Sequence, residues 1–279
     1  MNLYSINAGF FKLDGGAMFG VVPKSIWNKL NGADENNMCS WAMRCLLIED
    51  GNRLILIDNG MGTKQDEKFF GHYYLHGKDT LDNSLALHGF HRDDITDVFL
   101  THLHFDHCGG SIHRDGSTYV TAFKNAVYHS NEAHWNWAAA PNEREKASFL
   151  KENMFPIQES GQLQMVPVEE GFSFSPVIKI RFAFGHTEAM MLPQVTYKGK
   201  QIVFMADLLP SVAHIPLPYV MAYDTRPLHT MKEKKLFLSE AEASQYILFF
   251  EHDPVHECCT LQLTEKGIRQ KEVFRLKEI

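Results

Sequence analysis

The sequence lacks the features that mark membrane-spanning and disulfide-rich proteins. No segment approaches the roughly 20 consecutive apolar residues of a membrane span, and no basic start followed by an apolar run resembles a signal peptide. Its five cysteines are an odd number without a C-x-x-C pair, which argues against a disulfide framework and favours buried or half-buried free thiols. We therefore expect a soluble, cytoplasmic protein with no membrane partner.

Basic residues are scarce as well. The 27 Lys and Arg residues are outnumbered by 34 Asp and Glu residues, the formal net charge is −7, and no Lys/Arg-rich block occurs. Binding to nucleic acid needs a basic stripe along the phosphate backbone, so no nucleic-acid partner is expected. Neither a G-x-S-x-G motif nor a Walker-type loop is present, which removes two common rival chemistries.

Histidine, by contrast, is abundant. The chain has 15 histidines among 279 residues, a first indication of metal binding. The hydrophobic share of 44% is enough for a large buried core, and no low-complexity linker interrupts the chain. The sequence therefore predicts one α/β domain over residues 1–279.

Two hairpins are expected, and each ends on an aspartate. One spans residues 45–57 and ends at Asp58, and the other spans residues 195–205 and ends at Asp207. Each turns at a glycine between two apolar runs of strand length. This faint repeat favours two related halves.

Further elements follow from hydrophobic patterning and capping residues. Strands are expected at 95–100, 126–129 and 177–184, a strand pair within 260–276, and helices over 131–150 and 239–250. Ser239 is the expected N-cap of the second helix, with Glu242 three residues later. The charged run 143–146 is expected on a solvated face of the first helix.

The densest signal directly follows the strand expected at 95–100. The run Thr101-His102-Leu103-His104-Phe105-Asp106-His107-Cys108-Gly109-Gly110 places four potential metal ligands within six positions. Positions i and i+2 of an extended chain point the same way, so His102 and His104 can share one ion. A bend into a helix would turn Asp106 and His107 toward a second ion. Imidazole beside carboxylate suits a catalytic zinc site, and a purely structural reason for such a cluster is much the weaker explanation.

Small residues follow these ligands. Gly109 and Gly110 let backbone pack closely behind the site. Cys108 could be read as a nucleophile, but its position favours packing.

The motif His102-x-His104-x-Asp106-His107 resembles the signature of the metallo-β-lactamase superfamily. The resemblance implies a four-layer αβ/βα sandwich with the site at one sheet edge. The family's remaining pieces follow in order: a third histidine in Gly185-His186-Thr187, a bridging aspartate at Asp207, a last histidine at His252, and a supporting aspartate at Asp58. His256 is the alternative last ligand and is expected at the surface.

The resemblance implies two metal ions, expected to be zinc, with iron, manganese or cobalt as alternatives. One ion would bind His102, His104 and His186. The other would bind Asp106, His107 and His252, with Asp207 bridging the two.

The N-terminal region narrows the resemblance. Residues 13–24 (LDGGAMFGVVPK), Trp27 and residues 33–37 (ADENN) are similar to the branch that holds N-acyl-homoserine lactonases and methyl-parathion-hydrolase-like enzymes. This likeness implies a homodimer whose metal-bridging hydroxide opens the lactone ring of N-acyl-homoserine lactones (quorum quenching). Hydrolysis of organophosphates or aryl esters is the alternative. The partner is in either case a small-molecule lactone or ester.

Several residues are candidates for catalysis. Asp106 or Asp207 would carry the proton to the departing alkoxide. Lactonases of this branch resemble each other in a tyrosine shortly after the bridging aspartate, but here residues 208–211 are Leu-Leu-Pro-Ser. His214 is the candidate replacement, with Tyr219 and Tyr223 left open.

An apolar channel for an acyl chain is expected near the metals. Met18, Phe19 and Phe105 are the candidate substrate-binding residues, with Trp135 and Trp137 as further ones. A different class, electron-transfer di-iron proteins of this superfamily, replaces the second histidine with glutamate, whereas this chain keeps His104.

Overall fold

The computed structural model describes residues 1–279, which divide into two compact units. Unit 1 comprises Met1–Phe10 and Met43–Val168, and unit 2 comprises Phe11–Ala42 and Glu169–Ile279. The two units therefore alternate along the chain. The expected pair of halves is visible in this division, while a single domain over residues 1–279 stays a prediction.

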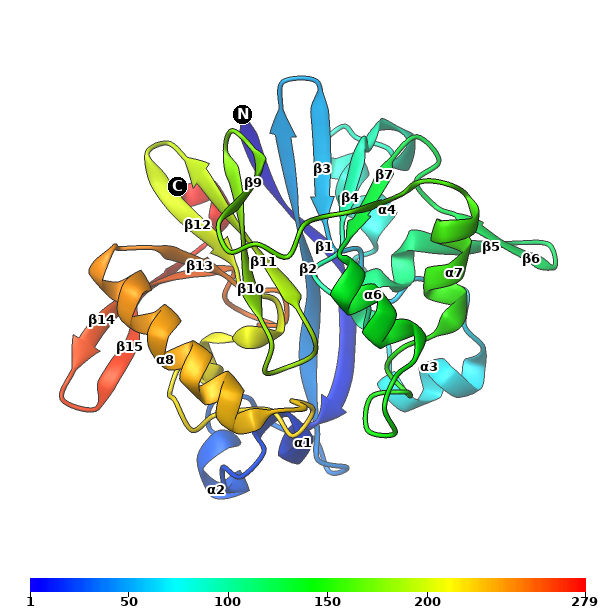
Figure 1. The fold of residues 1–279 in the computed structure, drawn as a ribbon. Helices are drawn as coiled ribbons and strands as arrows, with labels where there is room; N and C mark the ends of the chain where they lie inside the picture. The colour runs from blue at the N-terminus through cyan, green and yellow to red at the C-terminus, as the bar shows by residue number, and fades with distance from the viewer. The chain divides into compact units, whose positions relative to one another are not determined.

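Unit 1 is built on a six-stranded sheet in the order β1-β2-β3-β4-β7-β8 (Figure 1). The strands of this sheet are β1 (Asn2–Asp14), β2 (Met38–Asp50), β3 (Arg53–Ile57), β4 (Asp97–Phe99), β7 (Val127–Ser130) and β8 (Leu163–Met165). The end of β1 from residue 11 and the start of β2 up to residue 42 belong to unit 2. Strands β2 and β3 form the expected antiparallel hairpin, and Gly51 in its turn has a φ of +59°. Strands β3, β4, β7 and β8 are parallel, so their carboxyl ends share one edge of the sheet. Ligands of open α/β sheets gather at such an edge.

Short helices and a small ribbon complete unit 1. They are α3 (Glu67–Tyr73), α4 (Leu81–Leu87), η1 (Arg92–Asp94), α5 (Phe105–Cys108), η2 (Gly109–Ser111), α6 (Glu132–Ala139), α7 (Lys151–Glu159) and the strands β5 (Ile112–Asp115) and β6 (Thr118–Thr121). Strand residues such as Leu56 and Val98 share one buried core with Leu85 of α4, Trp135 of α6 and Ile157 of α7. Burial of each such side chain stabilises the fold by about 1.5–3 kcal/mol.

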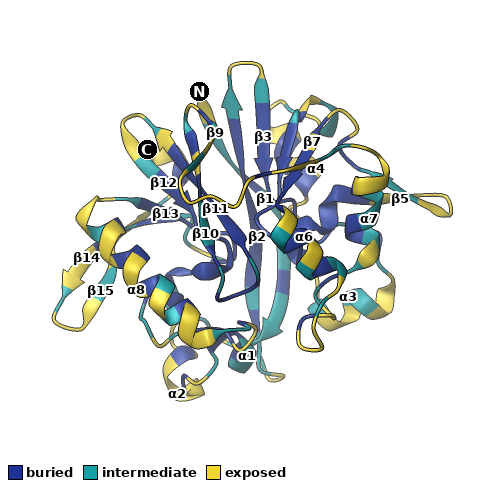
Figure 2. Cartoon of the chain, in the orientation of Figure 1, coloured by how far each residue is buried: buried dark blue, intermediate teal, exposed yellow.

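Unit 2 contains a seven-stranded sheet in the order β15-β14-β13-β12-β11-β10-β9. The strands are β9 (Phe172–Ser175), β10 (Ile178–Ala183), β11 (Met190–Tyr197), β12 (Lys200–Phe204), β13 (Ile247–Phe249), β14 (Cys258–Thr264) and β15 (Gly267–Phe274). Only β12 and β13 pair in parallel, and α8 (Pro227–Ala243) lies between them in the sequence. This helix contacts β14 and β15 on one side and is largely exposed on the other (Figure 2).

The other elements of unit 2 are short. They are α1 (Gly15–Phe19), α2 (Lys24–Trp27), η3 (Ala206–Leu208), η4 (Val212–His214) and η5 (Leu276–Glu278). No helix of either unit is both long enough and apolar enough to cross a membrane.

Most expected strands are confirmed, but both expected helices are wrong in extent. The helix expected over 131–150 ends at Ala139, because Pro141 disfavours helical backbone in the residue before it. The charged run 143–146 is therefore in a turn, and Glu145 is buried rather than solvated.

The helix expected over 239–250 is displaced toward the N-terminus. Ser239 lies inside α8, where its hydroxyl donates to the carbonyl of Lys235 (2.9 Å) instead of capping a helix. The helix has ended by Gln245, whose φ of 54° is left-handed, and the apolar run that follows forms β13. All five cysteines are free and buried, as expected.

Candidate metal centre

The first group of candidate ligands follows β4 in unit 1. The chain leaves this strand in an extended conformation, and α5 then begins at Phe105. Nε2 of His102 and Nδ1 of His104 lie 3.1 Å apart, so the two rings share a side as the i, i+2 spacing predicts. Nitrogens about 2.0–2.1 Å from one zinc ion lie about 3.3 Å apart in a tetrahedral site, so this spacing suits a shared ion.

Asp58 supports this group from behind, as expected. Its carboxylate accepts hydrogen bonds from the backbone N–H (2.8 Å) and the hydroxyl (2.6 Å) of Thr101. Oδ2 also lies 3.1 Å from Nδ1 of His107. His107 therefore presents its opposite nitrogen, Nε2, on the side of Asp106, whose carboxylate is 3.8 Å away.

The glycines after the ligands permit a close backbone approach. A Cβ on Gly109 would lie 2.2 Å from the carbonyl oxygen of Met61, and one on Gly110 would lie 2.2 Å from that of Asn59. Both positions require glycine, which confirms the expectation. Cys108 is fully buried, and burial raises the pKa of its thiol to about 12, which agrees with packing rather than nucleophilic attack.

The second group of candidate ligands lies in unit 2, around Asp207. Oδ2 of Asp207 is 3.1 Å from Nε2 of His186, and Oδ1 is 3.1 Å from Nε2 of His252. The carboxylate therefore divides its two oxygens between two histidines. That is the geometry expected of a bridging ligand.

Both histidines of this group are oriented through their other ring nitrogen. Nδ1 of His186 lies 2.7 Å from Oδ1 of Asp224, and Nδ1 of His252 lies 2.8 Å from the carbonyl oxygen of Ala42. Burial alone would lower the pKa of His186, but the carboxylates of Asp207 and Asp224 raise it to about 10. The group therefore favours a positive charge, as a cation site does.

The first turns of α8 hold the loop that carries His186. The Glu233 carboxylate accepts hydrogen bonds from the backbone N–H groups of Phe184 (2.7 Å) and Gly185 (3.0 Å). A Cβ on Gly185 would lie 2.3 Å from Oγ1 of Thr230, so glycine is required at this contact. Asp224 and Glu233 lie far from the ligand motif in sequence, and no local pattern marks them.

The surroundings of His214 are those of a histidine with a structural role. Its Nδ1 lies 2.8 Å from Oγ of Ser211, and its Nε2 lies 2.9 Å from the carbonyl oxygen of Met18. Its ring stacks on Phe19 at 4.7 Å, and burial lowers its pKa to about 4. Both nitrogens are engaged and the ring is neutral, so the geometry does not support the predicted catalytic role.

The candidate substrate residues lie in aromatic surroundings. Phe19 is fully buried and stacks on Trp27 as well as on His214, while Met18 is buried beside it. In unit 1, Phe105 contacts the rings of Phe69 (5.3 Å) and Tyr73 (4.6 Å) of α3. No sequence pattern marked these two α3 aromatics as neighbours of Phe105. Substrate contact by Met18, Phe19 and Phe105 stays a prediction.

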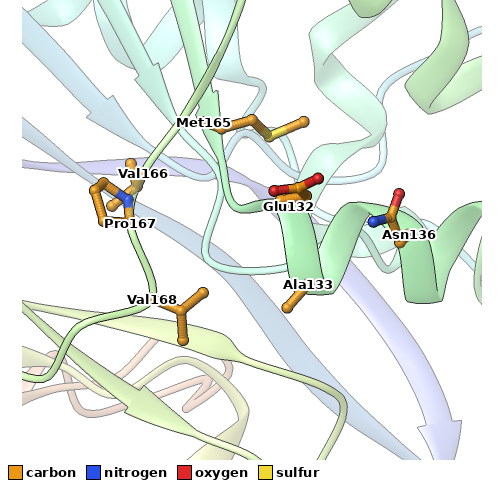
Figure 3. A pocket seen from close by; sticks show the side chains of 7 residues that line it. All are labelled: Glu132, Ala133, Asn136, Met165, Val166, Pro167 and Val168. Carbon is orange, nitrogen blue, oxygen red and sulfur yellow. The ribbon is translucent and has the colours of Figure 1, made fainter.

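A hollow of about 520 Å³ in unit 1 has a different character (Figure 3). It is lined by Glu132, Ala133 and Asn136 of α6 and by residues 165–168. Glu132 is its single carboxylate and no histidine lines it, so this hollow does not fit the metal chemistry of the two ligand groups.

The sequence profile of the metallo-β-lactamase superfamily matches residues 44–252, which is more than half of the chain. The chain belongs to the metallo-β-lactamase superfamily. No curated protein matches the chain in sequence. Its buried histidines and aspartates include groups that could hold a metal ion, as expected of a superfamily of metal-dependent hydrolases.

Solved structures similar to the chain include three hydrolases. A probable metal-dependent hydrolase from Staphylococcus aureus is 29% identical with a TM-score of 0.88, over 98% of this chain and 96% of that one. AidC, a dizinc quorum-quenching lactonase in complex with a homoserine product, is 21% identical with a TM-score of 0.80, over 98% and 95%. The hydrolase AbOPH is 20% identical with a TM-score of 0.78, over 98% and 94%. The predicted α/β metallo-β-lactamase fold is thereby confirmed.

Proposed function

We propose that the chain is a binuclear metal-dependent hydrolase that opens the lactone ring of N-acyl-homoserine lactones. The observation that carries the proposal is the complete set of family ligands, all of them buried. These are His102, His104, Asp106 and His107 of unit 1 and His186, Asp207 and His252 of unit 2. In the proposal they form one centre for two ions, and the imidazole and carboxylate donors fit zinc.

Divalent cations at such a centre supply Lewis acidity, which acidifies water and polarises a carbonyl oxygen. The residues of the chain supply the geometry. Asp207 turns one oxygen toward each of two histidines, which holds two ligand sets at a fixed spacing. Asp106 or Asp207 then delivers the proton to the alkoxide that leaves the opened ring.

Fold likeness to the lactonase AidC and the aromatic groups around Phe19 and Phe105 support a lactone with an acyl chain. Aromatic side chains offer large apolar contact area to such a chain. The alternative substrate class is an organophosphate or aryl ester, because residues 208–211 lack the tyrosine that helps lactonases of this branch bind the carbonyl.

A lactone-opening assay on the zinc-loaded protein tests the proposal. We expect turnover of N-acyl-homoserine lactones over several chain lengths, faster than turnover of a p-nitrophenyl phosphotriester. His104→Ala should reduce the rate by roughly 100-fold or more, because it removes a metal ligand. His113→Ala, at an exposed histidine of β5, is the matched control and should leave the rate unchanged. A protein that hydrolyses the phosphotriester and no lactone would overturn the lactonase proposal.

The predicted homodimer is proposed together with this function. Sedimentation of the purified protein should give about twice the chain mass of 31.9 kDa. A mass of one chain at micromolar concentration would rule the dimer out.

A further inference from the structure

The strongest unexplained feature is a buried carboxylate beside His104. Glu145 is only 3% exposed, although it lies in a turn between α6 and α7 within a run of charged residues. Its Oε1 lies 3.6 Å from Nε2 of His104. A carboxylate is costly to bury, so a specific interaction must compensate.

The surrounding turn fixes this carboxylate firmly. Oε2 of Glu145 accepts hydrogen bonds from the indole N–H of Trp137 (2.7 Å) and the side-chain amide of Asn142 (2.5 Å). The backbone N–H of Phe105 donates to the carbonyl of Ser148 (3.0 Å), which ties the same turn to the start of α5. With Oε2 held in this way, Oε1 is aimed at the imidazole of His104.

The other histidines of the proposed centre indicate the role of the contact between Glu145 and His104. Each has an oxygen within 3.1 Å of its Nδ1: the Thr101 hydroxyl for His102, Asp58 for His107, Asp224 for His186 and the Ala42 carbonyl for His252. His104 is reversed, because its Nδ1 is the nitrogen that faces His102. Its outward nitrogen is therefore Nε2, and the oxygen beside that nitrogen belongs to Glu145.

We propose that Glu145 is the positioning residue of His104. Its carboxylate receives the Nε2–H of His104, which fixes the tautomer and directs the Nδ1 lone pair toward the metal shared with His102. The separation of 3.6 Å between Nε2 and Oε1 exceeds a hydrogen bond by a few tenths of an ångström. A cation held at Nδ1 would polarise the ring and strengthen the attraction between these two atoms. The inference rests on the proposed metal centre and adds a residue that the ligand motif does not contain.

Cobalt(II) titration of metal-free protein tests this role without reference to activity. Affinity is measured by competition with a chromophoric chelator, and the visible spectrum of bound cobalt reports its ligand geometry. We expect Glu145→Gln to weaken binding of one ion by about 10-fold or more and to change the spectrum. Glu143→Gln is the matched control, since Glu143 lies in the same turn with its side chain 88% exposed.

Glu145→Asp separates positioning from folding, because it keeps the charge with a shorter reach. This variant should recover part of the lost affinity if the carboxylate acts on His104. Suppose that the wild-type protein binds two ions and that folded Glu145→Gln has the same affinity and spectrum. This result would overturn the role of Glu145 and leave the proposed centre standing. Wild type that binds no cobalt would overturn the proposed centre and this role with it. Loss of affinity in Glu145→Asp equal to that in Glu145→Gln would also count against the proposal.

Discussion

Individual histidines of the candidate centre are each oriented by one oxygen at the ring nitrogen that faces away from the ligand cluster. For His186 this oxygen is Oδ1 of Asp224, at 2.7 Å, and both side chains are buried. Such partners set the tautomer and raise the basicity of a ligand, and their loss usually weakens metal binding by about 10–100-fold. The orientation of a ligand histidine therefore depends on the residue that hydrogen-bonds its second ring nitrogen.

We expect Asp224→Asn to weaken zinc binding within that range while the protein stays folded, because the amide keeps the shape of the carboxylate and loses its charge. Chelator competition measures the affinity, and circular dichroism checks the fold. Unchanged zinc affinity in the folded variant would show that Asp224 does not act on His186.

For His214 we expect an effect on stability and not on catalysis, because its two ring nitrogens hydrogen-bond to Ser211 and to the Met18 carbonyl. His214→Phe preserves the stacking on Phe19 but leaves the Met18 carbonyl without its donor and the Ser211 hydroxyl without its acceptor. It should therefore cost about 1–3 kcal/mol. The rate of the zinc-loaded enzyme should keep its pH profile. A variant that is as stable as wild type but has lost one limb of the profile would restore His214 as a catalytic residue.

The pH dependence of stability provides a second check on His214. Burial lowers its pKa from 6.5 to about 4, so the unfolded chain binds the extra proton between these values. This residue should therefore make the free energy of unfolding rise as pH increases from about 4 to 6.5. Urea titrations should show a smaller rise in His214→Phe than in wild type.

Strands β3, β4 and β7 are joined by a charged network as well as by backbone hydrogen bonds. Oδ1 of Asp97 on β4 lies 2.7 Å from Nη2 of Arg53 and 2.8 Å from Nε2 of His129. Burial alone would raise the pKa of Asp97, but hydrogen bonds from His129, Arg53 and Thr96 outweigh it and hold this pKa well below 3.8. Arg53 and Asp97 begin β3 and β4, so the network ties these strands together at the end opposite to Asp58 and the ligand motif.

Asp97→Asn should lower the free energy of unfolding by about 1–3 kcal/mol at pH 7, a range reduced because Arg53 is partly exposed. The contribution of Asp97 is present above pH 3.8 and is lost as the pH falls toward the lower folded-state pKa. The difference between wild type and variant in urea should therefore shrink on acidification. A constant difference from pH 7 to pH 3 would contradict this account.

Local elements could be predicted from the sequence, whereas those that depend on distant partners could not. The hairpin β2–β3 is encoded by its own turn, and the four ligands after β4 lie within one motif. The run 247–249 is a strand because it pairs with β12 on one side and β14 on the other, partners that its own sequence does not reveal, so it was mistaken for helix. Glu145, likewise, was assigned to solvent because its partners Trp137 and His104 lie 8 and 41 positions away.

The whole molecule carries the candidate ligands in two groups, four side chains in unit 1 and three in unit 2. If the two groups bind the same ions, the metals connect the stabilities of both units, because binding to the folded state alone stabilises it. Removal of zinc should then lower the melting temperature of the entire chain in one transition. Two separated transitions, of which only one responds to zinc, would argue against a shared centre.

The most direct measurement is a count of zinc ions per chain by atomic emission in wild type, Asp106→Ala, His252→Ala and the double variant. The proposed centre predicts two ions in wild type and one in each single variant, because in that proposal Asp106 and His252 would be ligands of the same ion. The double variant should also retain one. Wild type with a single ion, or a double variant with none while each single variant keeps one, would contradict the account.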